Sequence, residues 1–178
     1  MGEPRTPRPA KLLMSLIASQ DDLLHQALEV LEGRYGEVDF KSDPIPFDVT
    51  DYYEEEMGKG LFRRFVTFAP LIRREELVRI KLETNEVERR FADPEGRRRV
   101  NIDPGYICAE HLILATTKGY THRPYLGEGI YADLTLIFQD GEFRPLPWTY
   151  PDYASEPIRR LLGEIRRRYL KQLRETRS

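Results

Sequence analysis

Apolar residues follow two different spacings along the chain, and these spacings predict both strands and helices. Residues 12–18 form a run, LLMSLIA, that is apolar except for Ser15 and is typical of a buried strand. The next segment predicts a helix that ends near Gly33, because apolar residues recur there every three or four positions. Val, Phe and Leu in residues 38–41 and 61–68 favour two further strands.

A longer helix is expected from about residue 74 to residue 91, where Leu77, Ile80 and Val87 share one side. A strand near residues 100–102 then completes the order β-α-β-β-α-β. This is the ferredoxin-like order, in which two helices cover one face of an antiparallel sheet. The predicted fold class is therefore α+β, with a mainly antiparallel sheet.

The C-terminal part adds strands and one helix to this beginning. Residues 112–117 and 130–138 favour strands, and Asp140-Gly141 predicts a tight hairpin turn after the second of them. These strands either extend the first sheet or form a second one. Residues 155–177 predict a terminal amphipathic helix, since apolar residues recur at helical spacing among charged ones.

The composition fits a single domain over residues 1–178, with residues 1–10 as a flexible N-terminal tail. No apolar run approaches the roughly 20 residues that cross a bilayer, so no membrane association is expected. The chain has one cysteine, Cys108, which excludes an intrachain disulfide. A reducing compartment, the cytoplasm, is therefore the expected location.

Charge is unevenly distributed along the chain. Residues 156–178 contain eight Lys or Arg and three Glu, so this end is positive while the remainder is negative. A basic helix of this kind can bind an RNA or a protein partner, including a second copy of the chain. Solvated arginines, or arginines paired with acidic neighbours, explain the same pattern.

Residues 101–153 hold a dense set of polar, aromatic and glycine-rich motifs, and their basic residues predict an anion site. Lys118, His122 and Arg123 lie close in sequence to Tyr125. Arginine binds a phosphate or a carboxylate through paired donors, and tyrosine can stack or donate a hydrogen bond. Ordinary solvated charges in a loop are the alternative interpretation.

Asp133 lies on an expected strand and shares one face of it with Tyr131, so both could face the same cleft. A structural salt bridge from Asp133 to Arg123 or Arg144 is the alternative. Trp148 is the sole tryptophan of the chain, and it could either wall a pocket or close the core.

The long helix could supply another wall. Lys81, Asn85 and Glu88 fall at i, i+4 and i+7, and they therefore share one side of that helix. Such residues can line a polar pocket as ligand-binding groups. Pairing with neighbours on a solvated surface is the simpler explanation.

Three residues are candidate acid or base catalysts, namely Glu56, Asp103 and His122. Carboxylates and imidazole transfer protons when their pKa values are suitably placed. Glu56 belongs to the acidic segment formed by residues 48–56, and a run of this kind also occurs in solvated loops.

Missing motifs exclude several classes of site. The chain has no G-x-x-x-x-G-K-[ST], and Gly127-x-Gly129 leads into an expected strand rather than the helix that a Rossmann turn needs. His111 and His122 are not followed by the x-[ST] of two-histidine phosphoesterases. No spacing typical of metal ligands is present. We therefore expect neither a metal nor a cofactor.

Five motifs in order together resemble the bacterial domain-of-unknown-function 4416 family: PFDVTDYYEEEMG, KLETNEVE, RVNIDPGY, HRPYLGEGIY and WTYPDY. The resemblance covers nearly the whole chain and brings no activity with it. Matching motif positions nominate a set of residues without assigning roles: Thr50, Tyr53, Glu56, Lys81, Asn85, Asn101, Asp103, His122, Arg123 and Tyr131.

We expect the protein to bind a small phosphate- or carboxylate-bearing ligand in a cleft formed by residues 101–153, with turnover of that ligand left open. The alternatives are an RNA-associated module that uses the basic C-terminal helix, and a protein-interaction or structural module without catalysis.

Overall fold

The computed structural model describes residues 2–48, 50 and 53–176. The strands are β1 (Ala10–Ala18), β2 (Val38–Lys41), β3 (Ile45–Pro46), β4 (Phe62–Ile72), β5 (Val100–Ile107), β6 (His111–Thr116), β7 (Tyr125–Gly127), β8 (Ile130–Gln139) and β9 (Glu142–Pro145). The helices are α1 (Asp21–Tyr35), α2 (Glu54–Met57), the 3-10 turn η2 (Arg74–Glu76), α3 (Leu77–Arg90), α4 (Pro151–Ala154) and α5 (Glu156–Glu175).

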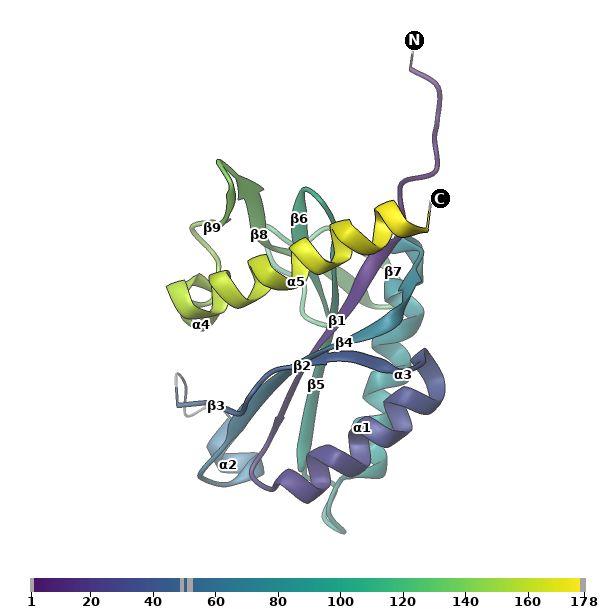
Figure 1. Ribbon diagram of the computed structural model, residues 1–178. Helices are drawn as coiled ribbons and strands as arrows, with labels where there is room; N and C mark the ends of the chain where they lie inside the picture. Colours follow the sequence, from purple (N-terminus) through teal and green to yellow (C-terminus); the bar gives the residue numbers. More distant parts are fainter. Residues whose placement is uncertain (1, 49, 51–52, 177–178) are drawn as a thin grey trace.

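The described strands form one sheet in the order β2-β4-β1-β5-β6-β8-β7, with β3 beside β4 and β9 beside β8. Neighbouring strands pair in antiparallel fashion. Helices α1 and α3 lie on one side of this sheet, and α5 crosses the other (Figure 1). The α+β class, the mainly antiparallel sheet and the C-terminal helix are thus confirmed.

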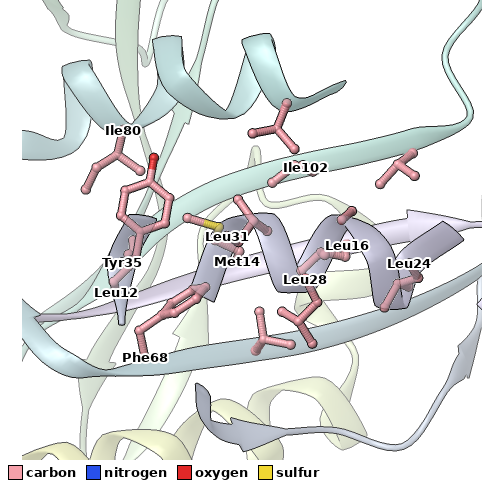
Figure 2. Close-up of a cluster of buried hydrophobic side chains, with 14 of the residues drawn as sticks. Leu12, Met14, Leu16, Leu24, Leu28, Leu31, Tyr35, Phe68, Ile80 and Ile102 are labelled. Atoms are coloured by element: carbon pink, nitrogen blue, oxygen red, sulfur yellow. The ribbon is translucent and has the colours of Figure 1, made fainter. Parts of the chain in front are cut away.

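Strand β1 lies at the centre of the core, and all nine of its residues are buried. Leu12, Met14 and Leu16 face α1 and α3, and they pack in one cluster with Leu28 of α1 and Ile102 of β5 (Figure 2). Burial on both faces requires apolar residues at successive positions rather than an alternating pattern. The LLMSLIA run therefore reflects a central strand.

The opposite face of the sheet is covered by α5. Leu13 of β1 and Phe65 of β4 belong to a cluster with Leu162 and Ile165 of that helix. The same cluster includes Phe143 of β9, so α5 packs across both ends of the sheet order. Within the described residues, no helix combines the length and the apolarity that a membrane span requires.

Several element boundaries differ from those expected. Strand β5 runs on to Ile107, well past residues 100–102, and the expected long helix begins with the turn η2. The C-terminal strands extend the first sheet, and Asp140-Gly141 forms the expected hairpin turn, with φ of 52° and 84°. Ala10 belongs to β1 rather than to the tail, because it pairs with Ile72. The expected tail and C-terminal helix also include residues 1 and 177, which lie outside the described residues.

The sheet splits between β5 and β6. These strands pair only from Gly105 to Ile107 within the described residues, although β5 begins at Val100. The backbone N–H and C=O groups of alternate residues point to the same edge of a strand. Those of Ile102 point away from β1 and contact α3, so the backbone of Pro104 faces that same edge. Proline has no N–H to donate, and the ladder to β6 therefore ends here.

Gly105 fixes the point where the two strands part. A Cβ atom at this position would lie 2.3 Å from the carbonyl oxygen of Ile113 and 2.7 Å from Leu114. Only a residue without a side chain therefore allows β6 to approach β5 so closely. In the Asp-Pro-Gly sequence, Pro104 therefore prevents pairing with β6, and Gly105 is the first residue that pairs with it.

We predict that Gly105→Ala lowers the free energy of unfolding by about 1–3 kcal/mol, because the added methyl group overpacks this contact. Urea denaturation measures the change. Gly33→Ala is the matched control: its Cβ would meet nothing within 4 Å, and α1 should gain about 0.5–1 kcal/mol. A Gly105→Ala protein as stable as the wild type would contradict the proposed close approach.

Candidate functional site

A cavity of about 650 Å³ opens where β5 and β6 separate. Its walls come from β5, α3, the residues that follow β6, and α4, which are far apart in sequence. It brings together six of the residues predicted to form a site: Lys81, Asn85, Asp103, Lys118, Arg123 and Asp133. The split in the sheet thus creates a space of the size that small-molecule sites occupy, roughly 300–1,000 Å³.

Helix α3 completes the hydrogen bonding of β5 at the split. The N–H of Ile102 donates to Glu88 Oε1 at 2.6 Å, and its carbonyl oxygen accepts from Lys81 Nζ at 3.3 Å. Both side chains are buried, and both come from the side of α3 on which Asn85 also lies. Two side chains therefore replace the missing strand, which explains why a Lys and a Glu stand seven residues apart on a buried helix face.

Burial raises the pKa of Glu88 to about 7, although nearby Lys81 opposes the shift. A carboxyl group with a pKa near neutrality can take up and release protons under ordinary conditions. Glu88 lines the cavity, so it joins the candidate acid and base residues.

Asp103 is held by a chain of hydrogen bonds along the cavity wall. Asn101 Nδ2 donates to Asp103 Oδ2 at 2.7 Å, and Arg98 Nη1 donates to Asn101 Oδ1 at 2.9 Å. Lys81 Nζ lies 3.6 Å from the other carboxylate oxygen of Asp103. The carboxylate is therefore fixed in orientation while its side chain remains 31% exposed.

Glu56 begins this chain from outside the cavity lining. Its carboxylate accepts from Arg98 Nε and Nη2 at 2.6–3.1 Å. The hydrogen bonds from Arg98 hold the pKa of Glu56 below its usual value. Glu56, a candidate catalyst, thus acts in this structure as a partner that positions Arg98.

Arg123 forms the salt bridge to Asp133 that was the alternative interpretation of Asp133. Its Nε donates to Asp133 Oδ2 at 2.8 Å, and its Nη2 donates to Tyr150 Oη at 2.8 Å. Asp133 is almost fully buried and also lies 3.3 Å from His122 Nε2. Arg123 therefore faces the cavity with much of its charge already balanced.

His122 and Trp148 stack on each other outside the described lining. Their ring centroids lie 4.9 Å apart with an interplanar angle of 15°, and Trp148 Nε1 donates to the carbonyl oxygen of Leu134 at 2.9 Å. Tyr125 and Tyr131 likewise form a ring pair, with centroids 5.2 Å apart, and neither belongs to the described lining. These four predicted ligand-binding residues instead support the segment that carries Arg123.

Arg63 is a cavity residue that the sequence interpretation missed. It is only 5% exposed on β4, makes an ion pair with Asp152, and lies over the rings of Phe47 and Tyr153 at 4.7 and 5.1 Å. An arginine inside a strand rich in Phe, Val and Leu was the available signal, because arginine is rarely buried without a partner. Arg89 and Arg98 gave no comparable signal, since both lie in charged surface segments.

Basic side chains outnumber acidic ones in the described lining. The basic residues are Arg63, Lys81, Arg89, Arg98, Lys118 and Arg123. The acidic residues are Glu88, Asp103, Asp133 and Asp152. Because the pKa of Glu88 is raised to about 7, a neutral fraction of this carboxyl enlarges the positive excess near neutral pH. Across residues 2–48, 50 and 53–176, no group of three His, Cys, Asp or Glu is placed to hold a metal ion.

Many basic residues of α5 have partners within the chain. Arg166 packs on the ring of Phe138 at 3.3 Å and donates to the carbonyl oxygen of Ala109. Arg159 contacts Glu142, and Arg168 pairs with Glu164. Pairing with neighbours thus accounts for much of this positive end.

The fold and the cavity define an α+β protein with a charged site at a split in its sheet. Residues 8–169 match the model of a family described as a domain of unknown function (DUF4416), and the chain belongs to this family. Comparison with curated proteins and with solved structures gives no significant match. Seven of the motif residues nominated from the resemblance line the cavity: Thr50, Tyr53, Lys81, Asn85, Asn101, Asp103 and Arg123.

We predict that Glu88 makes stability fall as pH rises. Its pKa is about 7 in the folded protein and near 4.5 when unfolded, so the folded state binds the extra proton between these values. Relative to Glu88→Gln, the wild type should lose up to about 3 kcal/mol of unfolding free energy as pH rises through this window.

Urea denaturation of both proteins at about pH 5 and about pH 8 measures this difference. The amide introduced by Glu88→Gln keeps an oxygen that can accept from the N–H of Ile102, so the comparison isolates the titration. Parallel pH profiles for the two proteins would show that Glu88 titrates normally.

Proposed function

We propose that the protein binds a small phosphate- or carboxylate-bearing ligand in the cavity at the sheet split. The excess of basic side chains around a cavity of about 650 Å³ carries this proposal. Such a space focuses the field of its charged walls and attracts an oppositely charged molecule. The ligand is small, because the cavity is bounded by α3, α4 and both strands of the split.

The positions of Arg89 and Lys118 support the proposal. Arg89 is exposed near the end of α3, and Lys118 is exposed beyond the end of β6. Both line the cavity from opposite sides of the split. An anionic group between them would interact with both without displacing the buried pair formed by Arg123 and Asp133.

The arrangement also supplies groups for proton transfer. Asp103 is fixed and partly exposed, whereas Glu88 is buried and has a pKa of about 7. Two carboxyl groups in different environments can serve as base and acid. Turnover of the ligand therefore has candidate residues, namely Asp103 and Glu88.

Two finer expectations stay proposals. A ferredoxin-like first half is supported by the order β2-β4-β1-β5 with α1 and α3 against one face. A reducing, cytoplasmic location is supported by the single buried thiol, Cys108. Among the described residues of α5, no specific contact favours an RNA or a protein partner.

We predict that a screen of inorganic phosphate, ribose 5-phosphate, nucleoside monophosphates and citrate finds at least one ligand that raises the melting temperature. A ligand present at about 100 times its Kd adds roughly 2.7 kcal/mol to stability. If none of these probes shifts the melting temperature, the proposed anion site is wrong.

The double variant Arg89→Ala/Lys118→Ala should bind the selected probe about tenfold more weakly by calorimetry, because two favourable charges are lost. Lys171→Ala is the control, since Lys171 lies on α5 with a side chain 72% exposed and its replacement also removes a positive charge. Equal losses in both proteins would indicate a nonspecific charge effect.

A further inference from the structure

Three buried side-chain atoms in the described part of the chain have no hydrogen-bond partner, namely Ser15 Oγ, Arg63 Nε and Tyr153 Oη. They come from β1, β4 and α4. A buried polar group without a partner costs about 1–3 kcal/mol, and native proteins have few of them. Their occurrence at one place therefore indicates a partner that binds there.

The strand register brings these groups together on the face of the sheet opposite α1. Ser15 stands directly across from Phe65 on β4 and from Asp103 on β5. Arg63 lies two residues from Phe65, and its guanidinium is 5.1 Å from the ring centroid of Tyr153. Burial raises the pKa of Tyr153, and an interaction with the Ser15 hydroxyl lowers it, so the two hydroxyls lie next to each other without reaching the geometry of a hydrogen bond.

Asp103 places a carboxylate beside these unpartnered groups. It is the cross-strand neighbour of Ser15, and it is close enough to raise the pKa of both Arg63 and Tyr153. Burial is the largest single influence on both groups, and it lowers the pKa of Arg63 and raises that of Tyr153. Asp103, Arg63 and Tyr153 all line the cavity, so hydrogen-bond donors and an acceptor occur at this end of its wall.

A second anion does not fit this end of the cavity. Asp152 already balances the charge of Arg63, and Asp103 adds another negative charge. Like charges within about 4–6 Å oppose each other strongly in a partly buried site. A hydroxyl group is uncharged, and it can accept from Arg63 or Tyr153 while donating to Asp103.

We propose that the end of the cavity formed by Arg63, Asp103 and Tyr153 binds a hydroxyl group of the ligand. The three unpartnered atoms are screened from solvent, so small rotations of Arg63 and Tyr153 accompany binding. This inference rests on the proposed anion site, which holds the other end of the same molecule. The ligand class is therefore a phosphorylated or carboxylated polyol, such as a sugar phosphate.

Ribose 5-phosphate and n-pentyl phosphate test the inference, because they share a phosphate and a five-carbon chain but differ in hydroxyl groups. Calorimetry should show ribose 5-phosphate binding to the wild type about tenfold more tightly. Equal affinity overturns the hydroxyl subsite and leaves the anion site intact. If neither compound binds, the hydroxyl subsite is wrong, and the anion site is wrong as well only if the other probes of the screen also give no shift.

Tyr153→Phe separates a ligand-binding role from a structural one. The Tyr153 hydroxyl makes no hydrogen bond of normal geometry in the free protein and only approaches Ser15, so its removal should leave the urea midpoint unchanged or higher. The preference for ribose 5-phosphate should fall to about threefold or less, with n-pentyl phosphate binding unchanged. A lower midpoint, or an unchanged preference, overturns the assignment.

Tyr125→Phe is the matched control, since the Tyr125 hydroxyl accepts from Gly129 outside the cavity. It should keep the full preference for the hydroxylated compound. Loss of the preference in this control as well would overturn the role given to Tyr153.

Discussion

The hydrogen bonds that two side chains of α3 make to the backbone of Ile102 allow the sheet to open. A strand edge inside a protein must have its N–H and C=O groups satisfied, and in the first part of β5 the neighbouring strand is absent. Glu88 and Lys81 supply the missing acceptor and donor from a helix. The space that another strand would have filled becomes a cavity, and the same two side chains become part of its wall.

This arrangement ties the cavity to groups outside it. Asp103 is oriented through Asn101 and Arg98 by Glu56, which stands on the short helix α2. On the other side of the split, Arg123 is oriented by Asp133 and Tyr150. Charged groups on both sides of the cavity are thus held in place by other side chains before a ligand binds. Because these groups are already ordered, the protein loses less conformational entropy on binding.

Apolar patterns and turn residues were sufficient to predict the fold class, the buried strand at LLMSLIA and the hairpin at Asp140-Gly141. These features depend on local periodicity and turn chemistry. Strand β3 and helix α2 were missed because two or four residues give no periodic signal. The extra length of β5 was hidden by Pro104 and Gly105, residues that ordinarily argue against a strand.

The candidate site was predicted less completely, because sequence motifs do not say which side chains share a cavity. Lys81, Asn85 and Asp103 were selected from helical spacing or motif content, and they meet Lys118 across the split. His122 and Trp148 were selected for their chemistry, but they satisfy each other by stacking. Arg63 reaches the cavity because of the way β4 pairs with β1, and such pairing between distant segments leaves no local pattern in the sequence.

Helix α5 places no residue in the described lining, yet it holds the two parts of the sheet that form the cavity. Gly105 to Ile107 alone join the two parts of the described sheet directly at the split, a narrow seam for walls that must keep a fixed separation. On the far face, Leu162 and Ile165 of α5 pack in one cluster with residues of both parts, including Phe65 and Phe143. Packing against α5 therefore helps to set the distance between the two walls of the cavity. A substitution on the apolar face of α5 can thus alter the cavity although no residue of the helix lines it.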